Sequence, residues 1–282
     1  MLVISPIQEK ILCALGKYKF LTSLQAWTII GNKNIQSIYN DLRILRGKEL
    51  VDCIVYGGVS KSGTMHKLNY LTTKGAKVVA EILQTELDSI KFPKSTNTLV
   101  KNDFVHRIHT IDQHIAFDKW FEQQSHEWLF FDRYFDKLGS QRKQADGALH
   151  SKTRVQLDDI HFINPDIVFA YGTIQKPNLF VLEIANGLDT KRIVQQIKGG
   201  IYAAYTGAVA DKYQLQVTPK LLVALEHEGT KNAVMQRVKM DGYLNEFEGL
   251  ENFLFFALQT QSKESWATSW QDINGQTATL FD

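Results

Sequence analysis

The first fifty residues contain three short stretches in which apolar side chains recur every three or four positions. This spacing is typical of amphipathic helices, because it places the apolar residues on one face. Ser5 followed by Pro6 predicts the start of the first helix, and Gly31 predicts the end of the second. The pattern predicts helices over residues 6–18, 22–30 and about 34–48.

The apolar pattern then changes to an alternation with a period of two, which is typical of β-strands. Residues 50–56 and 65–71 predict two strands, and the Gly- and Ser-rich residues 57–64 between them predict the turn of a hairpin. A further helix is predicted over residues 76–87. Three short helices followed by a hairpin are the elements of a winged helix-turn-helix, to which we assign residues 1–90.

In a winged helix-turn-helix the third helix enters the major groove, and the hairpin, or wing, contacts phosphates. The third helix here carries amide, hydroxyl and guanidinium groups that suit base edges, and a lysine lies at the tip of the wing. The predicted DNA-binding residues are Gln36, Ser37, Asn40, Arg43, Arg46 and Lys61. Two other interpretations stay open, since winged helices also bind proteins and a polar helix face is usually only solvated.

A polar stretch around Pro93 predicts a linker over residues 91–102. Helix and strand patterns follow in turn, so we expect a mixed α/β (α+β) domain over residues 103–260. Its expected elements are a helix at 103–124, strands at 128–131, 163–170 and 178–184, a helix at 188–205, a strand at 219–225, a helix at 230–239 and a strand at 252–258. The polar residues 261–282 are expected to form a weakly ordered tail.

The stretch over residues 132–161 is polar and longer than most loops. Two interpretations of it stay open, namely a clamp over single-stranded DNA and simple disorder. The clamp would use the basic side chains of Arg133, Lys137, Arg142 and Lys143.

The composition is that of an ordinary globular protein, because 44% of the 282 residues are hydrophobic and 22% are charged. These values exclude a chain dominated by disorder and a collagen-like chain. No run of about 18 apolar residues exists and the N-terminus lacks the pattern of a secretory signal, so we expect a cytoplasmic protein without membrane insertion. The two cysteines, Cys13 and Cys53, lack the spacing of metal ligands.

The small net charge of +2 conceals a difference between the two parts of the chain. Residues 1–100 contain 13 Lys or Arg and 7 Asp or Glu, a balance of +6, whereas the remaining residues have a balance of −4. A basic N-terminal third suggests a module that faces phosphates, joined to a second domain with another task. A chance fluctuation in surface charge is the alternative.

The candidate chemistry lies at two acidic residues that border apolar strands, Asp166 in Asn-Pro-Asp-Ile-Val-Phe and Glu183 in Val-Leu-Glu-Ile-Ala-Asn-Gly. If the hairpin closes around residues 174–175, Asp166 pairs directly opposite Glu183, with the two side chains on one face about 5 Å apart. Two carboxylates so placed repel each other unless a cation lies between them, which predicts bound Mg²⁺ or Mn²⁺. Such a metal generates a nucleophile and neutralises charge on a scissile phosphate.

The helix that follows places Lys191, Gln195, Lys198 and Tyr202 on one face. A lysine there would stabilise the pentacoordinate phosphate or help to activate the nucleophile. The alternative is purely structural: Asp166 would be an ordinary turn acid, and the lysines would be solvated.

The order of a helix, three strands, a helix and a strand, with Pro-Asp before the second strand and Glu at the end of the third, resembles the PD-(D/E)xK restriction-endonuclease-like fold. With the winged helix before it, the chain resembles the replication-relaxation group, and specifically the MobC-type plasmid relaxases. The resemblance covers about residues 5–225. It is carried by residues 104–109, 164–166 and 182–187 and by the helix with Lys198 and Tyr202.

The resemblance implies a protein that binds double-stranded and single-stranded DNA at a plasmid transfer origin and nicks one strand of a supercoiled plasmid. It implies that Asp166 and Glu183 hold the Mg²⁺ or Mn²⁺, and that the helix with His106 borders this site, where His106 would contact phosphate or act as a base. It also implies two protein partners, an accessory mobilisation protein and a coupling ATPase.

The chain departs from the family at the third motif position, where Ala185 replaces a lysine. We expect Lys191 or Lys198 to take that role. Otherwise the chain is a non-catalytic DNA-binding regulator or replication initiator with a degenerate nuclease domain. A third alternative, a restriction-type double-strand nuclease, predicts a symmetric dimer and a palindromic target.

Several further side chains are weaker candidates, and the sequence selects none of them. His109 would accompany His106, a third acid would come from Asp112, Asp118 or Glu122, and a nucleophilic tyrosine would come from Tyr18, Tyr39, Tyr202 or Tyr205.

Overall fold

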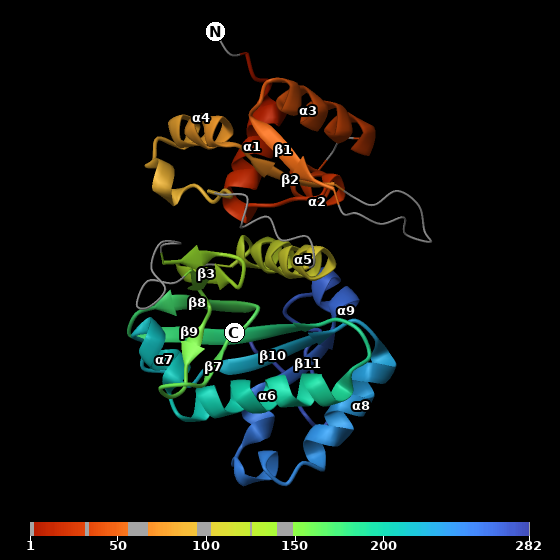
Figure 1. The fold of residues 1–282 in the computed structure, drawn as a ribbon. Helices are drawn as coiled ribbons and strands as arrows, with labels where there is room; N and C mark the ends of the chain where they lie inside the picture. The colour runs from red at the N-terminus through yellow and green to blue at the C-terminus, as the bar shows by residue number, and fades with distance from the viewer. Residues whose placement is uncertain are drawn as a thin grey trace. The chain divides into compact units, whose positions relative to one another are not determined.

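The computed structural model describes residues 3–31, 34–55, 67–94, 103–124, 126–139 and 149–281. The chain divides into two compact units, residues 1–112 and residues 113–282 (Figure 1). Helix α5 (Phe104–Phe121) crosses the division, so its first half belongs to the first unit and its second half to the second. None of the helices in the described ranges has both the length and the apolar character needed to cross a membrane.

The first unit contains the predicted helices and hairpin. Its elements are α1 (Pro6–Tyr18), α2 (Ser23–Ile30), α3 (Ile35–Gly47), β1 (Val51–Ile54), β2 (Leu68–Leu71), α4 (Thr73–Leu83) and the short 3-10 helix η1 (Leu87–Ser89). Capping boxes start the first two helices, formed by Ser5 with Gln8 and by Thr22 with Gln25. This order of helices and antiparallel hairpin confirms the predicted winged helix-turn-helix.

Asn69 of β2 ties the hairpin to the helices. Its backbone N–H donates to the carbonyl of Leu21 at 2.8 Å, and its carbonyl accepts from the N–H of Leu21 at 2.9 Å. Leu21 therefore adds a one-residue strand beside the hairpin. The side-chain amide of Asn69, which is fully buried, donates to the same Leu21 carbonyl at 3.0 Å.

The second unit is built on a five-stranded mixed sheet with the order β11-β10-β9-β8-β3. The strands β9, β10 and β11 are parallel, whereas β8 pairs antiparallel with both β9 and β3. The sheet strands are β3 (Trp128–Arg133), β8 (Ile167–Thr173), β9 (Lys176–Ala185), β10 (Lys220–Leu225) and β11 (Leu254–Leu258). The remaining elements are β4 (Lys137–Leu138), β5 (His150–Ser151), β6 (Val155–Gln156), β7 (Phe162–Ile163), α6 (Thr190–Tyr205), α7 (Ala208–Tyr213), α8 (Glu228–Lys239), η3 (Leu244–Glu246), η4 (Leu250–Asn252) and α9 (Gln259–Glu264).

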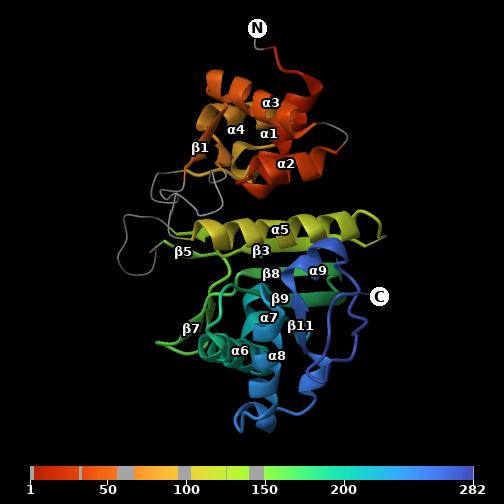
Figure 2. The same cartoon turned by 90° about the vertical axis from the view of Figure 1, so that its right-hand side faces the viewer.

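Helices lie on both sides of this sheet (Figure 2). Side chains alternate between its two faces, and each face has its own apolar layer. The face that carries Val168, Val181 and Val223 packs against α6, α7 and α8, and we call it the α6 face. The face that carries Phe169 and Phe180 packs against the second half of α5, and we call it the α5 face. The sheet is thus covered by helices on both sides.

The prediction of a weakly ordered tail over residues 261–282 is wrong. Trp266, Trp270, Leu280 and Phe281 from this segment are buried in the apolar layer of the α5 face, and Trp270 is fully buried. The backbone of Gln271 pairs with that of Phe256 in β11. The tail was misjudged because its many polar residues separate a few large aromatic side chains, and those few supply most of the burial.

The expectation of one irregular segment over residues 132–161 is also wrong in its described parts. β3 extends to Arg133, and the short strands β4 with β5 and β6 with β7 form two small antiparallel pairs. Arg133 is fully buried, which excludes it from a clamp over DNA. Arg142 and Lys143 lie outside the described residues.

Candidate functional site

The carboxylates of Asp166 and Glu183 meet across the β8–β9 hairpin, as the sequence predicts. Ile167 pairs with Leu182 and Val168 with Val181, so the next position brings Asp166 opposite Glu183. Each of the two acids is only 9% exposed. Asp166 also accepts a hydrogen bond at its Oδ2 from the backbone N–H of Ile184, at 2.7 Å.

The two acids lie on the α6 face, and their proximity changes the protonation of Glu183. Burial, the negative charge of Asp166 and a hydrogen bond to Asp166 together raise the pKa of Glu183 well above its ordinary value of 4.5. Glu183 therefore tends to hold a proton when no cation is bound. A bound cation would displace this proton, because it favours the ionised form of both carboxylates.

The two carboxylates fit a hard divalent cation, which prefers oxygen ligands. Mg²⁺ is commonly held by one or two carboxylates and keeps several of its waters, so two opposed acids suffice as protein ligands. In the described ranges, no group of three or more His, Cys, Asp or Glu side chains is arranged to hold a metal ion. Within the described part of the chain, Asp166 and Glu183 are thus the two acids that could hold such an ion.

Lys191 and Lys198, the two lysines expected to replace the motif lysine, differ in exposure and in ion pairing. Ala185 is buried in the apolar layer of the α6 face. Lys191 is exposed in the first turn of α6. Lys198 forms an ion pair with Asp241 at 2.7 Å, so the structure gives its ammonium group another partner than the acid pair.

The expectation that α5 borders the acid pair is not met by the second half of this helix, and for His106 it stays a prediction. Ala116, Phe117 and Phe121 of this helix pack on the α5 face, which is the side of the sheet opposite the acids. His106 lies earlier in α5, in the part that belongs to the first unit, where its carbonyl accepts from the hydroxyl of Thr110 at 2.9 Å.

Two of the three weaker third acids have other partners, and the third, Glu122, is exposed near the end of α5. Asp112 accepts a hydrogen bond from the side-chain amide of Gln25 at 2.8 Å. Asp118 lies 3.5 Å from Nε2 of His114 in the next turn of α5.

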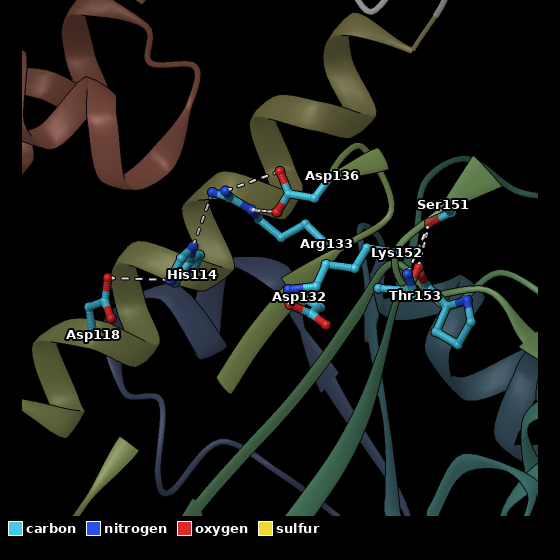
Figure 3. A network of polar contacts seen from close by, with 9 residues as sticks. His114, Asp118, Asp132, Arg133, Asp136, Ser151, Lys152 and Thr153 are labelled. Carbon is cyan, nitrogen blue, oxygen red and sulfur yellow. Dashed lines mark hydrogen bonds and ion pairs between the residues drawn. The ribbon is translucent and has the colours of Figure 1, made fainter. Parts of the chain in front are cut away.

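Sequence reasoning missed a second polar pair on the α6 face, Asp132 with Lys152 (Figure 3). Asp132 pairs in register with Val168, which follows Asp166 by two residues, so its side chain points to the same face as both acids. The ammonium group of Lys152 lies 2.7 Å from Oδ1 of Asp132. The strand predicted from the sequence ends at Phe131, whereas β3 continues to Arg133 and so includes Asp132.

A separate buried network occupies the opposite face (Figure 3). Arg133 is bonded through Nε to Asp136 at 3.0 Å and lies 3.4 Å from Nδ1 of His114. The ring of His114 stacks on Phe131 with centroids 3.7 Å apart. The network joins α5 to the end of β3, which is a structural role.

The polar face of α3 is largely open to solvent. Gln36, Asn40 and Arg43 are exposed and Ser37 is partly exposed. Arg46 instead donates to Oδ1 of Asn69 at 2.7 Å and so ties α3 to the hairpin. Lys61 lies outside the described residues. Tyr39 and Ile44, which were not predicted to face DNA, are each 40% exposed on α3.

Comparison with known proteins gives only partial likenesses. No family model and no curated protein matches the chain. A MarR variant from E. coli complexed with operator DNA is 21% identical over 29% of this chain and 54% of its own, with a TM-score of 0.25, so the chain spans about half its length. A ZitR variant from Lactococcus lactis is 18% identical over 44% and 77%, with a TM-score of 0.25. A MepR variant from S. aureus is 22% identical over 38% and 80%, with a TM-score of 0.24. These scores establish no shared fold, and the winged helix rests on the element order and pairing of this chain.

Proposed function

We propose that the protein binds DNA through its first unit and nicks one DNA strand with a divalent metal held in its second unit. The observation that carries this proposal is the buried pair of Asp166 and Glu183 on one face of the sheet. Burying two acids side by side costs free energy, and binding a cation between them recovers it. An arrangement of this kind is expected where a metal is used.

The chemistry is hydrolysis of a phosphodiester. The oxygen of a water molecule bonds to phosphorus, the bond from phosphorus to the leaving sugar oxygen breaks, one proton leaves the water and one proton ends on the leaving oxygen. Asp166 and Glu183 would hold Mg²⁺ or Mn²⁺, which when bound activates the water and neutralises charge on the phosphate.

Recognition would come from α3. Its exposed amide and guanidinium groups, on Gln36, Asn40 and Arg43, are the types that bond base edges in the major groove. A basic balance in the first hundred residues supports contact with phosphates. The finer form of the proposal, suggested by the family resemblance, is a nick at a plasmid transfer origin with an accessory mobilisation protein and a coupling ATPase as partners.

A non-catalytic DNA-binding regulator is the second candidate, and one observation favours it. The motif lysine is replaced by the buried Ala185, and Lys198 is held by Asp241. A regulator has no reason to bind Mg²⁺ at Asp166 and Glu183, so titration calorimetry with Mg²⁺ and Mn²⁺ discriminates the two candidates.

The deciding experiment is nicking of a supercoiled plasmid that carries the native locus of this protein, with Mg²⁺, with Mn²⁺ and with EDTA. Wild type is compared with Asp166→Asn and with Asp159→Asn, which changes an exposed acid in the same unit. We expect metal-dependent conversion to open circles that only Asp166→Asn abolishes. DNA binding by the wild type without nicking in either metal would refute the nuclease and favour the regulator.

A further inference from the structure

The pair of Asp132 and Lys152 lies one step along the sheet from the acid pair. Asp132 is opposite Val168, and Asp166 directly precedes β8, two residues before Val168 and on the same face. Diagonal neighbours of this kind lie about 7–8 Å apart, which is within reach of a long side chain. The backbone confirms the proximity, because the N–H of Tyr134 in the chain after β3 donates to the carbonyl of Asp166 at 2.9 Å.

The segment that carries Lys152 is fixed beside Asp166. The hydroxyl of Thr153 donates at 2.5 Å to the carbonyl of Pro165, the residue before Asp166. The backbone N–H of Lys152 donates at 2.7 Å to the carbonyl of Asp136. The position of Lys152 is therefore set by backbone contacts as well as by its ion pair.

The two members of the pair differ in exposure. The side chain of Asp132 is 4% exposed, whereas that of Lys152 is 41% exposed. Asp132 is thus an internal anchor, and the ammonium group that it holds is accessible to a ligand at the surface. A buried acid that aims an accessible ammonium group is suited to binding an anion beside the acid pair.

A phosphodiester at this site needs such a cation. It brings a negative charge toward two acids, and attack on phosphorus adds further negative charge in the transition state. Ala185 cannot supply a positive charge, Lys198 is paired with Asp241, and Lys191 lies exposed in the first turn of α6. Lys152 has the charge, the face and the exposure that the task requires.

We infer that Lys152, aimed by Asp132, is a catalytic residue of the second unit that contacts the scissile phosphate. This inference rests on the proposed nuclease function. Asp132 is a positioning residue, since it acts through Lys152.

The competing explanation is that Lys152 only neutralises the buried Asp132. The nearby Lys212 does not separate the two explanations. Its ammonium group donates to the backbone carbonyls of Lys152 and Arg154, and these bonds hold the segment in place whether or not Lys152 contacts a phosphate. To separate the two explanations, Lys152 must be replaced together with Asp132, whose negative charge it neutralises.

The test compares nicking by wild type, Lys152→Met, the double variant Asp132→Asn/Lys152→Met and Lys152→Arg. The double variant is needed because Lys152→Met alone leaves a buried acid uncompensated and reduces stability. Lys239→Met is the matched control, since it removes an exposed lysine from the same unit, at the C-terminal end of α8. Each variant is also tested for Mn²⁺ binding by titration calorimetry and for DNA affinity.

We expect the double variant to nick at least about 100-fold more slowly than wild type through kcat, with unchanged Mn²⁺ binding and DNA affinity. Lys152→Arg should regain part of the rate, and Lys239→Met should match wild type. A double variant that nicks at the wild-type rate would show that Lys152 only neutralises Asp132. A wild type that does not nick would instead refute the proposed nuclease, and with it the role of Lys152.

Discussion

Replacing Glu183 with Gln should stabilise the metal-free protein, although it removes a group of the proposed site. Glu183→Gln keeps the size of the side chain and its ability to donate a hydrogen bond to Asp166. It removes the negative charge that burial and Asp166 make unfavourable. An ordinary buried polar residue would lose stability on such a change.

The size of the gain follows from the geometry. Directly opposed side chains lie about 5 Å apart, and two unit charges at that distance repel by about 3 kcal/mol at an effective dielectric constant of about 20. Protonation of Glu183 removes part of this repulsion in the wild type, so the expected gain is about 1–2 kcal/mol. For a unit of this size the melting temperature should rise by roughly 3–6 °C.

The pH dependence gives a second check, with a defined sign. The pKa of Glu183 is higher in the folded than in the unfolded chain, so the folded wild type is penalised as pH rises above 4.5. The difference between Glu183→Gln and wild type should therefore be absent below pH 4.5 and grow as pH rises through the raised pKa.

Urea unfolding in EDTA, followed by tryptophan fluorescence, measures this effect. Four of the five tryptophans lie in the second unit, so the signal reports mainly on that unit. Glu127→Gln, at an exposed acid before β3, is the matched control and should change little. Adding Mn²⁺ at about 100 times its Kd should stabilise wild type by about 2.7 kcal/mol and stabilise the Gln variant less.

Loss of stability in Glu183→Gln at every pH would refute this reasoning. It would show that the ionised carboxylate gains more from its surroundings than it loses to Asp166, and that the pair has no need of a cation.

Three further outcomes test the fold. Asn69→Ala should cost about 2–3 kcal/mol in urea unfolding of the first unit, because the buried amide bonds both a strand carbonyl and a guanidinium group. Trp270→Ala should cost about 3–5 kcal/mol in the second unit, whereas a disordered tail would tolerate it without loss. Burial and the nearby Asp52 raise the pKa of Tyr70 to about 12, so absorbance titration should show a phenol with that midpoint that Tyr70→Phe removes. The stability that the Tyr70–Asp52 bond contributes should be present below pH 10 and be lost between pH 10 and 12.

The sequence by itself was enough wherever a signal was local. Helix caps such as Ser5 and the apolar periods around them predicted the winged helix, because capping and amphipathicity act within one or two turns. The alternation of the strands and the length of their turn predicted that Asp166 faces Glu183, since a hairpin has a register that its turn sets.

Only the tertiary structure decided which groups from distant segments meet. Asp132 and Lys152 come from different elements, and the ion pair of Lys198 with Asp241 joins a helix to a later loop. The C-terminal Trp270 is part of the core because it packs with residues from the sheet and α5, which are far from it in the chain. Local pattern specifies the elements and their faces, whereas the partner of each buried charge depends on how the layers pack, because burial and pairing arise between segments far apart in the chain.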